Sequence, residues 1–348
     1  GKMKAVQTMT DLEKLCSRVT EAADCAVITD DVNRRYFTAM KSSAGTLVVF
    51  PEKAYFIIDF RYIEKAKKTV TACEVILQDK LYEQINSLIE KHGAKTVSVN
   101  ADTCTLSELI AYQQKLNAEV IADTKLAEII REIRTVKSQE QIDKIIKAQR
   151  IAEKGFAHML DFIKVGRTEK EIQLELDYYM LKNGAEALSF DTIALSGSNT
   201  SLPHGVPSDK KVESGEFVLM DFGATYDGWH SDMTRTVCVG KPSDKMKSVY
   251  ETVLNAQLSA LDAVKAGMSG KELDKIARDI ITDAGYGDNF GHSLGHGVGV
   301  EIHESPYASP SREDILPENS IVTVEPGIYL EGKFGVRIED FVVVTENG

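Results

Sequence analysis

The chain has 348 residues, of which 43% are hydrophobic and 27% are charged, and its formal net charge is -12. This length and composition predict a soluble globular protein with two domains. The acidic charge argues against a nucleic-acid partner, and no apolar run approaches the roughly eighteen residues that a membrane span needs.

Residues 10–127 alternate between helical and strand patterns, which predicts an α/β domain. A helical pattern covers residues 11–23. Apolar strand patterns cover residues 26–29, 46–50, 54–59, 74–77 and 96–99. We find no glycine-rich phosphate-binding motif in this half. The alternation predicts a mostly parallel or mixed sheet covered by helices.

The pattern changes at the charged segment 131–138, where we place the boundary between domains 1–130 and 131–348. Ser138 and Gln141 have capping-box spacing before an amphipathic run to residue 160, and Thr168 and Glu171 repeat it before a helix to residue 182. Strand patterns begin at residue 190. They are followed by helical patterns at 244–266 and 269–285 and strands near 321–324 and 335–344. This half is therefore predicted to be α+β.

Two acids, Asp221 and Asp232, flank a turn at residues 226–228, where Asp-Gly is a strong hairpin signal. If the hairpin closes there, the two carboxylates lie roughly opposite each other on one face. Like charges in that position destabilise a sheet, and a cation between them removes the conflict. The alternative interpretation is that one of these two acids is a solvated turn residue and the other is a charge at a strand end.

Of seven histidines, five lie between residues 204 and 303. They are His204, His230, His292, His296 and His303. A lone histidine is more often a hydrogen-bonding residue than a ligand, but the last three share one glycine-rich stretch. Glycines around His296 would let the backbone approach an ion or ligand closely.

Two further acids, Glu325 and Glu339, end strand-like runs of the same half. Such acids are usually surface residues. Together with Asp221, Asp232 and His296, however, they would form an oxygen-rich site with one imidazole. That ligand set suits Mn²⁺, Co²⁺, Fe²⁺ or Zn²⁺, and two ions rather than one.

Five separated motifs of this half resemble, in order, the signature of the pita-bread metallopeptidases. They are Asp221-Phe-Gly-Ala224, Ser231-Asp-Met-Thr-Arg-Thr236, Gly295-His-Gly-Val-Gly299, Val324-Glu-Pro-Gly327 and Val336-Arg-Ile-Glu-Asp340. That family includes Xaa-Pro aminopeptidase, prolidase and methionine aminopeptidase. The first half resembles its creatinase-like N-terminal domain through Asn33-Arg-Arg-Tyr-Phe37 and Ile58-Asp-Phe-Arg-Tyr62. The expected fold is a pita-bread domain preceded by a smaller α/β domain.

The resemblance implies that two divalent ions, with manganese favoured over Co, Zn or Fe, are held by five ligands. These are Asp221, Asp232, His296, Glu325 and Glu339, with Asp232 and Glu339 bridging. It implies substrate contacts for His204, His292, His303 and Arg337, and more weakly for Tyr329, for which a core position is equally compatible. Arg337 and Thr234 would also orient ligands. No role carries over to His230.

The implied chemistry is hydrolysis of an Xaa-Pro bond. Two ions about 3.5 to 4 Å apart would lower the pKa of a shared water toward roughly 7. His303 would help to hold the oxyanion, and Glu325 would pass a proton to the leaving prolyl nitrogen, with His204 near the substrate. Short proline-containing peptides are thus the expected substrates.

The sequence favours an aminopeptidase over a dipeptidase. A dipeptidase must bind the carboxylate of proline, normally with an arginine. Some similar prolidases carry that arginine directly after His-Glu-x-Pro, where this chain has Tyr307. Arg312, a few residues later, could compensate. The alternative is therefore an Xaa-Pro dipeptidase with the same five ligands.

Two other function classes are less compatible with the sequence. A non-catalytic binding protein of this fold is disfavoured because all five ligands are present, and a one-metal oxygenase would want two histidines and one carboxylate. Relatives are often dimers, so a homodimer is expected. Five scattered cysteines without Cys-x-x-Cys, and no basic and apolar leader pattern, predict a cytoplasmic location.

Overall fold

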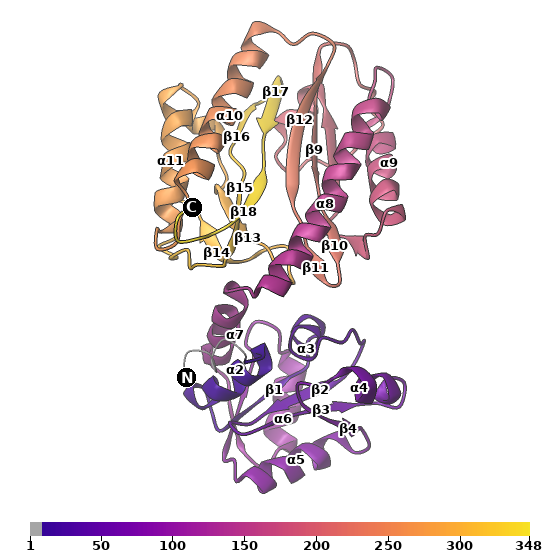
Figure 1. The fold of residues 1–348 in the computed structure, drawn as a ribbon, viewed down its shortest axis with the longest axis vertical. Coiled ribbons are helices and arrows are strands. Elements are labelled where there is room, and N and C mark those ends of the chain that lie inside the picture. The colour runs from indigo at the N-terminus through magenta and orange to yellow at the C-terminus, as the bar shows by residue number, and fades with distance from the viewer. Residues whose placement is uncertain (1–8) are drawn as a thin grey trace. The chain divides into compact units, whose positions relative to one another are not determined.

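The computed structural model describes residues 9–348, and the chain forms two compact units, the first ending at Arg134 and the second spanning Thr135–Gly348. Figure 1 shows the ribbon of each unit. The boundary that we place between residues 130 and 131 lies inside helix α7 (Lys125–Thr135) and stays a prediction. Within the described residues, no helix is both long and apolar enough to cross a membrane.

The first unit contains one mixed sheet of six strands in the order β4-β3-β2-β1-β5-β6. Its strands are Cys25–Ile28 (β1), Thr46–Val49 (β2), Ala54–Ile58 (β3), Glu74–Leu77 (β4), Thr96–Val99 (β5) and Glu119–Ile121 (β6). β2 pairs antiparallel with β1 and β3, and the other pairs are parallel. All residues of β1, β2 and β3 are buried, so both faces of the sheet need cover.

Helices cover the sheet, and their apolar residues contribute to two separate hydrophobic cores. One core joins apolar residues of α2 (Asp11–Arg18), α3 (Asp31–Thr38), α4 (Ile63–Thr69) and α7, and the other joins those of α5 (Leu81–His92) and α6 (Leu106–Lys115). The predicted first helix ends earlier than expected, because the chain continues as a 3-10 turn at Val19–Glu21. The predicted α/β character of this unit is confirmed.

Two helix pairs flank the strands of the second unit (Figure 1): α8 (Gln139–Phe162) with α9 (Glu169–Lys182), and α10 (Asp244–Ala263) with α11 (Gly270–Asp283). Both predicted capping boxes are present, at Ser138 with Gln141 and at Thr168 with Glu171. These motifs fix where α8 and α9 begin, because each satisfies two backbone donors that the helix itself leaves open.

The strands of the second unit form several small antiparallel sheets. They are Ala187–Leu188 (β7), Ile193–Ser196 (β8), Glu216–Phe222 (β9), Ala224–Tyr226 (β10), Trp229–His230 (β11), Met233–Val239 (β12), Gly295–Gly297 (β13), Glu304–Ala308 (β14), Ile321–Val324 (β15), Gly327–Leu330 (β16), Phe334–Arg337 (β17) and Asp340–Val343 (β18). The sheet orders are β11-β10-β7, β12-β9-β8, β14-β13-β15-β18 and β16-β17.

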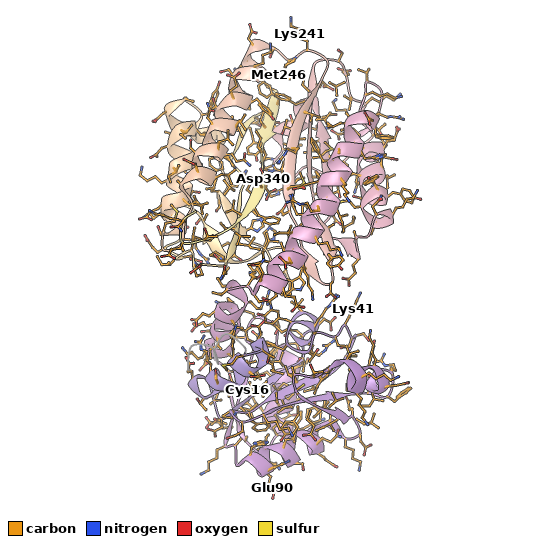
Figure 2. All side chains as sticks on the ribbon, in the orientation of Figure 1. Cys16, Lys41, Glu90, Lys241, Met246 and Asp340 are labelled. Atoms are coloured by element: carbon orange, nitrogen blue, oxygen red, sulfur yellow. The ribbon has the colours of Figure 1, made fainter. Side chains whose placement is uncertain are left out.

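A bridge between Thr234 and Glu339 joins strand β12 to the segment between β17 and β18. Asp340, the next residue, lies among the strands between the two helix pairs (Figure 2). Its carboxylate accepts hydrogen bonds from Arg235 at 2.7 Å and from Gln257 of α10 at 2.8 Å. The strands that carry the predicted ligands are therefore linked to one another and to the helices that flank them.

Candidate metal centre

The hairpin that carries Asp221 and Asp232 turns at the Asp-Gly pair that the sequence indicated, but its cross-strand pairing differs from the expected one. Asp227 and Gly228 both have positive φ, 48° and 82°, and form a two-residue turn between Tyr226 and Trp229. With that register Asp221 lies opposite Thr234, not opposite Asp232. The expectation of directly facing carboxylates is therefore wrong. Asp232 lies two residues before Thr234, hence diagonal to Asp221 and on the same face.

A break in this hairpin frees Asp232 from the ladder. Strands β9 and β10 are interrupted at Gly223, and β11 and β12 at Ser231 and Asp232. A Cβ atom on Gly223 would lie 2.1 Å from the Ser231 carbonyl oxygen, so only glycine permits this approach. Ser231 fills the break by accepting a hydrogen bond from the Ala224 N–H at 2.9 Å.

Four predicted ligands converge. One atom from each of Asp232, His296, Glu325 and Glu339 lies within 4.8 Å of the others. His296 Nε2 is 3.2 Å from Asp232 Oδ2 and 3.5 Å from Glu325 Oε2. His296 Nδ1 donates to the Gly297 carbonyl oxygen at 2.9 Å, which directs Nε2 toward the carboxylates. This convergence is the arrangement that a metal ion requires.

The buried carboxylates leave oxygen atoms without a hydrogen-bond donor. Asp221 Oδ1, Asp232 Oδ1 and Glu339 Oε2 are buried and have no hydrogen-bond partner among residues 9–348. The other oxygen of two of these groups is held, because Arg337 Nη2 donates to Asp221 Oδ2 at 3.0 Å and Thr234 Oγ1 donates to Glu339 Oε1 at 2.7 Å. Buried acceptors without partners are unfavourable. Divalent cations bound to the free oxygens would satisfy them, so the residues present fit the predicted metals.

When no cation lies between them, the carboxylates of this site repel one another. Burial, followed by the charge of Asp232, raises the pKa of both Asp221 and Glu339 well above the usual range. Burial also opposes ionisation of Glu325, but the neighbouring Glu339 and His296 side chains outweigh it and hold the pKa of Glu325 well below its usual range. Such divergent pKa values in one cluster are typical of functional sites.

The imidazole of His296 responds to the same charges. Burial alone would lower its pKa, but Asp232 and Glu325 more than offset that effect and raise the pKa well above the usual value. A proton on Nε2 thus occupies the position at which a metal ion would bind to this nitrogen. Metal binding would have to displace that proton.

A chain of hydrogen bonds runs from Asp221 to His292. Arg337 Nη1 donates to the Tyr329 hydroxyl at 2.9 Å, and that hydroxyl is 2.6 Å from His292 Nε2. His292 Nδ1 donates to the Ser293 carbonyl, and burial lowers the pKa of His292. The neutral ring therefore accepts from Tyr329. The pKa of Tyr329 is raised to about 12, chiefly by burial, so its hydroxyl keeps the proton that it donates.

His303 and His204 also lie near this group. The His303 and His296 rings have centroids 4.3 Å apart. The pKa of His303 is lowered, first by burial and then by the charge of His296, with a contribution from His204. Arg337 Nη1 contacts the carbonyl of Pro203 at 3.4 Å, directly before the exposed His204. The structure thus brings the predicted substrate histidines together, and their roles stay predictions.

Glu169 supports the segment that carries His204. Its role was not predicted from the sequence. Its buried carboxylate accepts from the N–H and hydroxyl of Ser196, from Asn199, and from the N–H and hydroxyl of Ser208. In the sequence Glu169 looks like an ordinary acid in the first turn of a helix, because its partners lie 27 to 39 residues away.

Tyr307 and Arg312, which bear on the choice between peptidases, are neighbours. Tyr307 pairs with His296 in the β13–β14 register, and the Arg312 guanidinium lies 4.5 Å from the centroid of the Tyr307 ring. Arg312 Nε also donates to Asp314 Oδ1 at 3.0 Å. An arginine is thus present next to Tyr307, the strand partner of the predicted ligand His296.

Known proteins match both halves of the chain. Metallopeptidase family M24 matches residues 143–346, and the creatinase/prolidase N-terminal domain matches residues 12–136. The Xaa-Pro dipeptidase of Pyrococcus furiosus is 40% identical over 97% of this chain and 95% of its own length. The solved Xaa-Pro dipeptidase from Bacillus anthracis has a TM-score of 0.93 and 41% identity, covering 97% of this chain and 95% of that one. The X-Pro aminopeptidase of Thermotoga maritima has a TM-score of 0.87 and 39% identity, covering 94% of each.

Proposed function

The chain belongs to metallopeptidase family M24, and we propose that it is an Xaa-Pro dipeptidase, which hydrolyses the bond before proline in a dipeptide. That it is a metallopeptidase follows from the family. The group Asp232, His296, Glu325 and Glu339, whose ligand atoms lie within 4.8 Å of one another, supports a metal site that would serve either Xaa-Pro peptidase. The choice of a dipeptidase rests on the relatives. Two relatives with this assignment, cited above, each align with nearly the whole chain.

We assign the metals to the five predicted ligands, with Asp221 completing the group of four. Bound divalent ions would supply a hydroxide nucleophile at neutral pH and a positive charge for the developing oxyanion. Manganese is the proposed ion, because four carboxylates and one imidazole form a hard, oxygen-rich set. Arg337 holds Asp221 in place through its 3.0 Å hydrogen bond.

The remaining residues are assigned by position. Glu325, whose carboxylate lies 3.5 Å from His296 Nε2, is the proposed proton carrier toward the prolyl nitrogen. His303, with a lowered pKa and its ring beside His296, can donate a hydrogen bond to the oxyanion from a neutral imidazole. His204 and His292 are the proposed contacts of the substrate. The proline amide has no N–H, so general peptidases bind it poorly and a dedicated site is useful.

Recognition of the free proline carboxylate is assigned to Arg312. Its guanidinium lies over Tyr307, whose strand partner is the ligand His296. A guanidinium matches a carboxylate with two parallel hydrogen bonds. The second candidate is an Xaa-Pro aminopeptidase, which the sequence favoured. It is supported by the ion pair of Arg312 with Asp314, which engages the same guanidinium inside the protein.

Cleavage of Ala-Pro beside Ala-Pro-Ala decides between the two. We expect the manganese-loaded enzyme to release proline from Ala-Pro and to leave Ala-Pro-Ala nearly intact. Arg312→Ala should raise the KM for Ala-Pro about 10-fold or more, since a charged hydrogen bond is lost. Lys333→Ala, which changes an exposed cation, is the control. Rapid cleavage of the tripeptide only would establish the aminopeptidase, and cleavage of neither would contradict the Xaa-Pro assignment.

We also propose a cytoplasmic homodimer. All five cysteines are free thiols, which fits a reducing compartment. Sedimentation of the purified protein at micromolar concentration should give twice the chain mass of 38.4 kDa. A monomer that retains full activity would contradict the dimer.

A further inference from the structure

The turn that carries His303 is attached to the rest of the second unit at both ends. It joins β13 to β14, where Gly297 pairs with Glu304 across a local irregularity of the register. The His303 ring is exposed and contacts the His296 ring, but within the described residues no hydrogen bond holds its imidazole. The position of that ring therefore depends on the main chain of residues 299–304.

Glu304 holds the C-terminal end of this turn. Its Oε1 accepts the Glu301 N–H at 3.1 Å, which closes the turn, and its Oε2 accepts from Lys137 Nζ at 2.9 Å. The ion pair is deeply buried, with side-chain exposures of 0% for Lys137 and 7% for Glu304. Glu304 is the next residue after His303, so a shift of one moves the other.

Lys137 is itself firmly placed. Its N–H donates to the Asn319 carbonyl at 2.9 Å, and the next residue, Ser138, is the N-cap of α8 with a complete capping box. Helix α8 packs against β10 and β11 of the hairpin that carries Asp221 and Asp232. Lys137 thus relates the His303 turn to the same scaffold that positions the carboxylates.

His230 holds the N-terminal end of the turn. Its N–H donates to the Gly299 carbonyl at 2.8 Å, and its ring Nδ1 lies 3.1 Å from the same oxygen. A Cβ atom on Gly299 would lie 2.5 Å from Glu304 Oε2, so glycine makes room for the carboxylate. Both ends of the turn are therefore fixed by contacts that converge on Gly299 and Glu304.

We propose that Lys137 and Glu304 are positioning residues, which hold the 299–304 turn so that the His303 imidazole stands beside the metal centre. A buried ion pair is weak support for stability, because well-packed apolar side chains stabilise a core equally well. In this proposal the ion pair instead fixes the geometry of the 299–304 turn. The proposal rests on the function proposed above, in which His303 acts on the substrate.

A double-mutant cycle on the manganese-loaded protein tests it. Lys137→Met should lower kcat for Ala-Pro by about 10- to 100-fold, because small misplacement of a reacting group is costly, while KM changes by less than about 3-fold. In a His303→Ala background the same substitution should have almost no further effect, since the two act through one group. Val253→Ala, a buried α10 residue, is the stability control and should leave kcat unchanged.

Hydrogen exchange of residues 297–305 provides a readout independent of activity. Lys137→Met should accelerate it with or without metal, and Val253→Ala should not. If Lys137→Met does not fold, Glu304→Gln, which keeps the side-chain shape, is expected to give the same kinetic pattern. An unchanged kcat, a full loss retained in the His303→Ala background, or unchanged exchange would each overturn the proposal. Wild-type protein that cleaves no Xaa-Pro bond would instead contradict the proposed function, and exchange would still decide whether the pair holds the turn.

Discussion

The carboxylates of the candidate metal centre use their two oxygens differently. In Asp221 and Glu339 one oxygen accepts from a buried donor, Arg337 or Thr234, while the other has no donor. The held oxygen fixes the orientation of the group, and the free oxygen is directed to the place where a cation would bind. Arg337 and Thr234 are therefore expected to orient the Asp221 and Glu339 carboxylates, although neither is a predicted metal ligand.

Asp232 is the residue on which metal binding should depend most. Asp232→Asn removes a buried charge at the point where the ligand atoms meet, so activity on Ala-Pro should fall by at least about 100-fold. Metal content measured by mass spectrometry should fall with it. Asp227→Asn is the matched control, because Asp227 is an exposed acid of the same hairpin and asparagine accepts its positive φ. Full metal content in Asp232→Asn would contradict the assigned site.

Metal binding should stabilise the protein more as the pH rises. The folded-state pKa values of Asp221, Glu339 and His296 are raised, so their contribution to stability is present at low pH and lost as pH rises through those values. The lowered pKa of Glu325 acts with the opposite sign, but its contribution changes only below the usual pKa of a glutamate and so below about pH 5. The Tm difference between manganese-loaded and metal-free protein should therefore grow from about pH 5 to about pH 8. A difference that shrinks over this range would contradict the account.

The Tyr329 hydroxyl should matter for the reaction. Tyr329→Phe removes the group that joins Arg337 to His292, and kcat/KM for Ala-Pro should fall about 10-fold. Tyr286→Phe, at a partly buried tyrosine that packs against a core of the second unit, should have no effect. Equal activity of both variants would show that Tyr329 serves only packing, which is the interpretation that the sequence left open.

At the scale of elements, the hairpin β9–β12 determines the geometry of the site. Its register is continuous from the two-residue turn to the far ends of β9 and β12, and the break at Gly223 interrupts it without shifting it. The break places Asp232 diagonal to Asp221 and leaves its main chain outside the ladder. The sequence indicated the Asp-Gly turn but not the exact cross-strand pairing, since a one-residue change of register moves every pair.

Gly223→Ala tests that break. The added methyl group would clash with the Ser231 main chain, which cannot move without shifting Asp232, so we expect a loss of about 2 kcal/mol in stability together with weaker metal binding. Gly291→Ala, at a position with no atom within 4 Å of the added group, is the control. Both effects can be followed by thermal unfolding with and without manganese. A variant as stable as Gly291→Ala would contradict the requirement for glycine.

Elements were predictable where the signal is local. The capping boxes at Ser138 and Thr168 were read correctly, because every group that they involve lies within three residues. Strand β6 was missed, because its three residues are only partly buried and show no apolar run. Glu169 and the Lys137–Glu304 pair could not be found in the same way, since their partners are distant in the sequence and are brought together only by folding.

For the whole molecule, the predicted fold is confirmed, with a creatinase-like N-terminal domain and a pita-bread metallopeptidase domain. The alternation of strands and helices indicated the first unit from general principles. The second needed the ordered motifs, because α+β patterning alone is compatible with many arrangements of short strands. Four of the five predicted ligands converge on one group, although the first and the last of them lie more than a hundred residues apart in the chain.

A manganese titration tests the proposal that this protein is a dinuclear metallopeptidase that cleaves before proline. Metal-stripped protein is titrated with Mn²⁺ while bound metal and proline release from Ala-Pro are measured on the same samples. If the site holds two metal ions, we expect no activity without metal and full activity at two ions per chain. Full activity in the stripped protein, or no release of proline at any occupancy, would contradict the proposal.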